Sequence, residues 1–167
     1  MFKKFAASFL ILMLAASLVS GCQPKSETIK IGLQGPMTGD YAYEGKGFEN
    51  AVRMLVDQTN AEGGILGRQV ELVVEDDAGD PTQAALVAQR LVDAGVVAAI
   101  GGYNSTATEP ASEIYNEAGI LHITPSSTAV RLTEKGFPRF FRVCFLDDRQ
   151  GLFAAKFMSE VVGAKNI

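Results

Sequence analysis

Apolar residues along the chain follow two spacings, and these predict strands separated by helices. Five short stretches are apolar at every second position or almost throughout, which is typical of strands in a parallel sheet. These stretches are TIKIGLQG, VELVVED, VVAAIGG, ILHITP and FFRVCF. Between them, apolar residues recur every three or four positions, the spacing that lines one face of a helix.

Two of the predicted helices have clear signals at their ends. The first is expected over about residues 44–60, with an apolar face made of Phe48, Ala51, Val52, Leu55 and Val56. The second should begin after Asp80, because its carboxylate can accept hydrogen bonds from free amides of the first turn. Pro81 suits the next position because it has no amide that needs a partner. Gly95 predicts the end of this helix.

Three further helices are predicted. Thr106 and Glu109 have the spacing of a capping box, so a helix should begin near Thr106 and end before Gly119. A short helix is expected over residues 126–136 and another over residues 151–162. The last of these should bury most of an apolar face made of Leu152, Ala155, Phe157, Met158 and Val161.

This alternation predicts the fold class. Strands that alternate with helices through short loops form a parallel sheet with helices on both faces, so a Rossmann-like α/β fold is expected. The 167 residues, of which 47% are hydrophobic and 20% charged, suffice for one core and not for two complete domains. Because the chain ends where the alternation calls for another strand, a truncated protein is expected.

The N-terminal segment predicts export. Two lysines precede an apolar run and then small residues, which is the layout of a signal peptide. Its ending, VSGC at residues 19–22, resembles the lipobox of bacterial lipoproteins, where the cysteine thiol carries the lipid. Residues 1–21 are therefore predicted to be a lipoprotein signal peptide, Cys22 the lipidation site, and residues 22–27 a flexible tether. An uncut transmembrane anchor is the alternative.

Composition and motifs argue against several classes of function. A formal net charge of −4 argues against nucleic acid as a partner. The sequence contains no GxGxxG, Walker or GxSxG motif, and no cofactor is expected. Cys144 is the one cysteine besides Cys22, so no internal disulfide is expected after export, and Cys144 should be buried apolar filler.

Two other sets of reactive side chains have ordinary structural explanations. Glu75, Asp76 and Asp77 could hold Mg²⁺, but a loop cap combined with solvated charge is the expected role. His122 is the only histidine and lies in an apolar strand. We therefore expect His122 to be a core residue rather than a general base.

Small polar side chains follow three of the predicted strands, in the loops GPMTGDYAYEG, GGYNSTATEP and TPSSTA. In an open parallel sheet, ligands bind beyond the carboxyl ends of the strands, where helix N-termini also point. Hydroxyls near two helix starts could bind the two oxygens of one carboxylate. They belong to Ser105, Thr106, Ser126, Ser127 and Thr128. Helix capping without any ligand is the alternative for each of them.

These segments together resemble the type I periplasmic binding proteins, and among them the solute-binding lipoproteins of branched-chain amino acid ABC transporters. The similar runs are IKIGLQGPMTG, AVRMLVDQTNAEGGILGRQVELVVEDDAGDP, IGGYNSTATEPAS, AGILHITPSSTA and FRVCFLDDRQG. The resemblance implies a two-lobed protein that closes on its ligand without catalysis and presents it to a membrane permease. Residues 28–145 would form an incomplete N-terminal ligand-binding lobe, and residues 146–167 the crossover and first helix of a truncated second lobe.

The resemblance also implies which residues bind the ligand, an amino acid or a related small amide. The residues that would grip its carboxylate are Ser105, Ser126 and Thr128. Tyr41 would cover the ligand, with Tyr43 as the alternative because the register of that loop is open. Tyr103 adjoins the pocket and would narrow or reshape it.

The expected function is therefore the solute-binding component of an ABC importer, lipid-anchored outside the cytoplasmic membrane in the periplasm or on the outer cell surface. Its expected partners are the small ligand, the permease, and the membrane through the N-terminal lipid. One alternative is a ligand-sensing receptor or regulator domain of the same fold. Another is an exported hydrolase that uses Ser105 or Ser127 with His122.

Overall fold

The structure is a computed structural model that describes residues 27–166. The predicted signal peptide, Cys22 and most of the tether lie outside these residues. The strands are β1 (Ile29–Gly35), β2 (Val70–Asp76), β3 (Ala98–Gly101), β4 (Leu121–Thr124) and β5 (Phe140–Arg142). They form one parallel sheet in the order β2-β1-β3-β4-β5.

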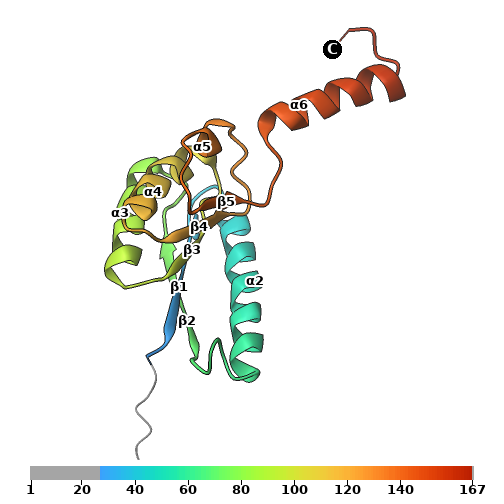
Figure 1. Cartoon of the computed structure of the whole chain (residues 1–167). Coiled ribbons are helices and arrows are strands. Elements are labelled where there is room, and N and C mark those ends of the chain that lie inside the picture. Colours follow the sequence, from blue (N-terminus) through green and yellow to red (C-terminus); the bar gives the residue numbers. More distant parts are fainter. Residues whose placement is uncertain (1–26, 167) are drawn as a thin grey trace, which may run out of the picture.

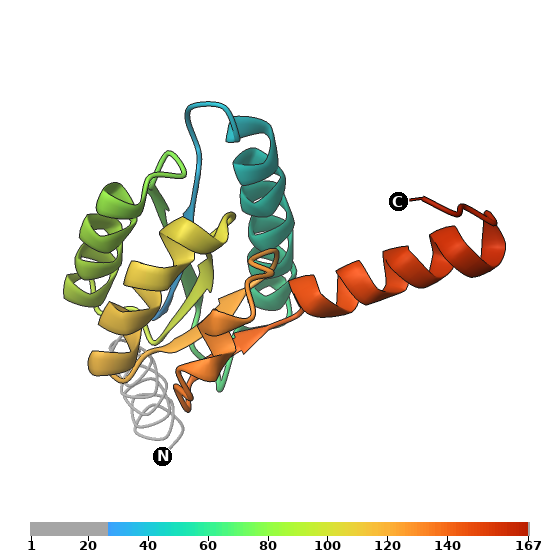
Figure 2. The same ribbon diagram turned by 90° about the horizontal axis from the view of Figure 1, so that it is seen from above.

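Helices cover both faces of this sheet. The described helices are α2 (Ala42–Ala61), α3 (Pro81–Asp93), α4 (Ser105–Glu117), α5 (Arg131–Glu134) and α6 (Asp147–Lys156). α6 continues as the π-helical turn η1 (Phe157–Val161) and does not cover the sheet. α3 and α4 lie side by side on one face and α2 lies on the other (Figures 1 and 2). The predicted α/β fold with helices on both faces is confirmed. None of the described helices is long and apolar enough to cross a membrane.

The strand order reverses at β1, and a ligand crevice is expected at this edge of the sheet. From β1 the chain moves to β2 on one side and then to β3 on the other side of β1. The loops after β1 and β3 therefore diverge at the carboxyl ends of these strands, the point at which open parallel sheets bind ligands. Gly35 pairs with Asp76 and Gln34 with Gly101, so the three strands end at the same level.

The better packed face lies beneath α3 and α4. Its buried core consists of Val87, Ala88, Leu91, Val96, Ala99, Ala111, Tyr115 and Ile120. Gly32 of β1 allows the close approach of α3, since a Cβ at this position would lie 3.1 Å from Cδ1 of Leu91. The Asp80 carboxylate accepts a hydrogen bond from the Gln83 amide at 2.8 Å, which confirms the predicted start of α3.

The opposite face is only half covered. α2 lies over β2 and β1, whereas Ile100, Ile123 and Phe141 of β3, β4 and β5 are exposed or half-buried on the same side. An apolar groove of about 220 Å³ lies between α2 and these strands. Parallel strands are ordinarily buried on both faces, so this half of the sheet lacks the covering layer that such strands usually have.

The start of α4 differs from the prediction. Asn104, not Thr106, is the N-cap, and its Oδ1 accepts a hydrogen bond from the Ala107 amide at 2.8 Å. Thr106 is the second residue of the helix, and its hydroxyl donates to the same Asn104 oxygen at 3.1 Å. Asparagine and threonine are both good caps, and the spacing alone pointed to the wrong one.

The C-terminal elements also differ from the prediction. The helix expected over residues 126–136 is only the four-residue α5, and the last strand has only three residues. The final helix begins at Asp147 rather than Gly151, and it projects away from the sheet (Figures 1 and 2). Leu152, Phe157 and Val161 are consequently exposed, so the prediction that they face inward is wrong. An apolar stripe predicts that one side of a helix packs against another surface. It does not predict that this surface belongs to residues 27–166.

Candidate functional site

The loops after β3 and β4 meet at the carboxyl edge of the sheet. Ser105 is the first residue of α4, and its Oγ accepts a hydrogen bond from the Ala129 amide at 3.1 Å. This bond places Ser105 beside the 126–129 loop, as the analysis of the sequence predicted. No described residue accepts the hydroxyl hydrogen of Ser105, so this hydrogen can be donated to a ligand.

Backbone amides at the same place are also free to donate. The first amides of α4, at Ser105 and Thr106, have no partner within the helix, as at every helix start. The amides of Ser126 and Thr128 likewise donate to no described residue. Unpaired amides at a helix start favour an anion, because they add their partial positive charge to the helix dipole. The chemistry of this edge therefore suits a carboxylate.

A set of hydroxyls holds the two loops together. Ser127 is buried, and its Oγ lies 2.6 Å from the hydroxyl oxygen of Thr108 and donates to the Gly102 carbonyl at 3.2 Å. The Thr124 hydroxyl donates to the same carbonyl at 2.9 Å. Ser126 donates to the Tyr103 carbonyl at 2.6 Å, so its hydroxyl hydrogen is already engaged. Of the three predicted carboxylate ligands, Ser126 is thus placed as a link between the loops.

Thr108 and Thr124 were not predicted to contribute to this edge. Both are buried, and their hydroxyls form hydrogen bonds at the joint between the loops. The feature of the sequence that could have indicated their role is Gly102, which lies against Thr108. Gly102 has φ +75°, and a Cβ there would lie 1.8 Å from Oγ1 of Thr108. Only glycine therefore lets α4 approach the loop so closely.

Aromatic rings cluster beside the ends of β1 and β3, where the crevice is expected. The ring centroids of Tyr41 and Tyr103 are 5.0 Å apart, and those of Phe48 and Tyr103 are 6.1 Å apart. Tyr43 is 88% exposed and takes no part in this cluster. The geometry therefore favours Tyr41 over Tyr43. Phe48 was predicted only as one member of a helical stripe, because its contact with Tyr103 depends on how α2 crosses the sheet.

The acidic residues at the end of β2 serve the backbone. Asp76 Oδ1 accepts from the amides of Met37, at 2.7 Å, and Thr38. Burial raises the pKa of Asp76, but hydrogen bonds from the Thr38 hydroxyl and from three amides outweigh it, and the pKa is lowered overall. This is the predicted loop cap. The prediction of solvated charge is wrong for Asp77, which is fully buried, whereas Glu75 forms an exposed ion pair with Arg90 at 2.8 Å.

His122 is a core residue, as predicted. It is 2% exposed, its Nε2 lies 3.2 Å from the Gly101 carbonyl oxygen, and its ring packs between Tyr115 and Phe140. No described hydroxyl contacts it, so neither Ser105 nor Ser127 has the base that a hydrolase would need. Cys144 is half-buried rather than fully buried, and its thiol donates to the Ser127 carbonyl at 3.4 Å.

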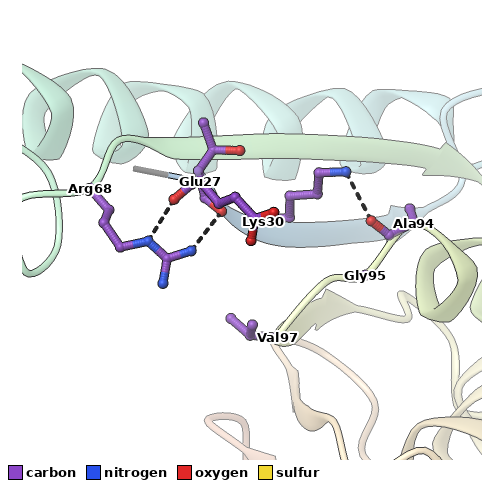
Figure 3. A pocket seen from close by; sticks show the side chains of 7 residues that line it. Glu27, Lys30, Arg68, Ala94, Gly95 and Val97 are labelled. Atoms are coloured by element: carbon purple, nitrogen blue, oxygen red, sulfur yellow. Dashed lines mark hydrogen bonds between the residues drawn. The ribbon is translucent and has the colours of Figure 1, made fainter. Parts of the chain in front are cut away.

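A larger cavity of about 620 Å³ lies at the opposite edge of the sheet, where the strands begin (Figure 3). Its two cations already bind main-chain oxygens. Arg68 donates to the carbonyls of Glu27 and Thr28 at 2.6 and 3.2 Å, and Lys30 donates to that of Ala94 at 3.0 Å. These bonds hold the start of β1 and the end of α3. The cavity therefore lies away from the candidate site, and its cations have a structural role.

Relatives with described ligands resemble this chain. An amino acid binding protein from Pseudomonas aeruginosa is 42% identical over 159 residues, which is 94% of this chain and 42% of the relative. A leucine-, isoleucine-, valine-, threonine- and alanine-binding protein from the same organism is 41% identical, over 93% of this chain and 42% of the relative. The chain thus spans less than half the length of these relatives.

Solved structures share the fold. A branched-chain amino acid transporter substrate-binding protein from Streptococcus pneumoniae, in complex with isoleucine, superposes with a TM-score of 0.79 at 36% identity. The match covers 83% of this chain and 40% of that one. A leucine-binding protein from Thermotoga maritima superposes with a TM-score of 0.75 at 32% identity, over 83% of this chain and 39% of that one. The sequence pattern of the periplasmic binding proteins matches residues 28–167. The chain therefore belongs to the periplasmic binding protein family.

Proposed function

We propose that this chain forms the N-terminal ligand-binding lobe of a solute-binding protein that captures branched-chain amino acids for an ABC importer. The observation that carries the proposal is the hydrogen bond from the Ala129 amide to the Ser105 hydroxyl. It brings one free hydroxyl hydrogen and the unpaired amides of two βα loops to the same place. The described ligands of the relatives are amino acids, which all carry a carboxylate.

In this proposal the residues divide into three roles. Ser105 and Thr128 donate to the ligand carboxylate from their hydroxyls and amides. Ser126 contributes its amide, while its hydroxyl holds the Tyr103 carbonyl. Tyr41 and Tyr103 line the crevice and contact the apolar side chain of the ligand. An apolar wall beside a small set of oriented donors is the usual composition of a small-molecule site.

The setting of the protein belongs to the same proposal. Cys22 carries a lipid that anchors the mature protein outside the cytoplasmic membrane, and the loaded protein delivers its ligand to a membrane permease. The basis for the anchor is the signal-peptide layout that ends in VSGC. No catalytic step is required for this function.

A thermal-shift panel tests the proposal. The native protein, expressed from its complete reading frame without the signal peptide, is heated with leucine, isoleucine, valine, glutamate or 4-hydroxybenzoate. At a hundredfold excess over the dissociation constant, a true ligand raises the free energy of unfolding by about 3 kcal/mol. We expect this for the branched-chain amino acids. A shift with 4-hydroxybenzoate alone, or with none of the compounds at millimolar concentration, would contradict the proposal.

A further inference from the structure

A buried carboxylate lies behind the aromatic cluster. Asp77 is fully buried, and none of the ion pairs among the described residues involves it. Burial raises the pKa of its carboxyl group, whereas hydrogen bonds from Gly79 and Gln34 oppose this rise. A buried carboxylate without a cation is costly, so its retention calls for an explanation beyond packing.

Both oxygens of Asp77 are used to hold neighbouring segments. Oδ1 accepts from the Gly79 amide at 2.9 Å, and Oδ2 accepts from Nε2 of Gln34 at 3.1 Å. Oε1 of Gln34 in turn accepts from the Tyr115 hydroxyl at 2.7 Å. A single network therefore joins the end of β1, the loop after β2 and the last turn of α4.

The segment that Asp77 holds touches two parts of the candidate site. Gly79 has φ +72°, and a Cβ there would lie 3.0 Å from the Tyr41 ring and 3.2 Å from Nδ2 of Asn104. The Gly79 carbonyl accepts from Asn104 Nδ2 at 2.9 Å. Asn104 caps α4 immediately before Ser105, so displacement of Gly79 would disturb both the aromatic cluster and the carboxylate-binding helix start.

We propose that Asp77 is a positioning residue for ligand binding, which acts through Gly79 on Tyr41 and on the Asn104 cap without touching the ligand. The inference rests on the proposed function, because it names the site that Asp77 supports. The network of Asp77, Gln34 and Tyr115 would then contribute to ligand affinity as well as to stability. The same network explains why both oxygens of the carboxylate are engaged by loop and strand rather than by a cation.

Three variants of the native protein test this role by leucine titration calorimetry. Asp77→Ala removes both acceptors and should weaken leucine binding by about 5- to 30-fold. Asp77→Asn keeps Oδ1 as the acceptor for the Gly79 amide but loses the acceptor for Nε2 of Gln34, so its affinity should fall between those of Asp77→Ala and the native protein. Asp93→Ala removes an exposed carboxylate of α3 and should leave the affinity unchanged.

Tyr115→Phe provides a second variant if Asp77→Ala does not fold. It removes only the hydroxyl that donates to Oε1 of Gln34, so it should weaken leucine binding relative to the native protein. A readout without ligand separates this proposal from the proposed function. Hydrogen exchange at the Gly79 and Ala107 amides, measured on the free protein, should accelerate in Asp77→Ala and in Tyr115→Phe but not in Asp93→Ala.

The outcomes are distinct. Unchanged exchange at Ala107, or a leucine affinity that is the same in Asp77→Ala and the native protein, would overturn the positioning role. Equal loss of affinity in Asp77→Asn and Asp77→Ala would also overturn it, because the hydrogen-bond geometry would then not matter. If the native protein does not bind leucine while exchange accelerates as expected, the proposed function fails and the positioning of Asn104 by Asp77 stands.

Discussion

At the scale of single residues, burial determines the protonation state of His122. Burial lowers its pKa to about 4. Nε2 contacts the Gly101 carbonyl, whereas Nδ1 has no hydrogen-bond partner among the described residues. A second proton would have to sit on Nδ1, between two aromatic rings. The imidazole therefore stays neutral in the folded protein under conditions in which the unfolded chain is already protonated.

This difference predicts how stability depends on pH. The folded pKa of His122 is below the unfolded value of about 6.5, so the unfolded state binds more protons and stability is lost as the pH falls from about 6.5 to about 4. The loss should approach roughly 3 kcal/mol. Urea unfolding of the native protein and of His122→Gln at several pH values measures it, because glutamine does not titrate. A stability difference between the two proteins that stays constant over this range would contradict the prediction.

The role of a residue could be predicted where it depends on its neighbours in the sequence. The core position of His122 followed from the apolar strand around it. The resemblance named Tyr41 and left Tyr43 as the alternative, because the choice depends on the first turn of α2. The contact of Phe48 with Tyr103 was not predicted, because it depends on where that helix crosses the sheet. Asp77 was misjudged for a similar reason. A carboxylate in a loop is usually solvated, and only the folded chain shows that Gln34 and Gly79 enclose it.

At the scale of elements, a side-chain cap fixes the start of two described helices, α3 and α4. α3 begins with Asp80 as cap and Pro81 in the first position, and both were evident in the sequence. α4 begins one residue after Asn104, and its correct start required the conformation of the glycine turn that precedes it. The extent of α5 and β5 was overestimated, because residues 126–130 are held by loop-to-loop hydrogen bonds that no local pattern encodes.

The cap of α3 supports a stability prediction. Asp80→Ala removes the acceptor for the Gln83 amide and should lower the free energy of unfolding by about 1 kcal/mol. The matched control is Asp57→Ala on the exposed side of α2, which should change stability by less than about 0.5 kcal/mol. Urea unfolding at constant pH compares the two. Equal effects of both substitutions would mean that the cap contributes nothing beyond the removal of a surface charge.

At the scale of the whole molecule, the sheet brings together loops that are far apart in the sequence. The parallel-sheet rule predicted that residues 105 and 126–128 would meet, and the bond between Ser105 and Ala129 places them side by side. The rule could not say which hydroxyls would face the crevice. Those of Ser126, Ser127 and Thr108 are engaged between the loops, and this follows only from the close approach that Gly102 permits.

Two apolar surfaces of the molecule remain open. One is the half of the sheet that α2 leaves uncovered, and the other is the stripe of α6 and η1 that projects from the fold (Figure 2). The inward orientation expected for α6 failed because amphipathic spacing identifies a packing face without identifying its partner. Both surfaces lie outside the crevice in which the proposed ligand contacts are found.

The central claim is that hydroxyls and amides from two βα loops bind the carboxylate of an amino acid. Titration calorimetry of the native protein with leucine and with leucinol, which lacks the carboxylate, tests it most directly in combination with Ser105→Ala and the exposed control Ser159→Ala. We expect Ser105→Ala to weaken leucine binding by roughly 1–3 kcal/mol. Leucinol should bind weakly to every variant, and Ser159→Ala should match the native protein. Equal affinity for leucine and leucinol, or unchanged leucine affinity in Ser105→Ala, would contradict the account.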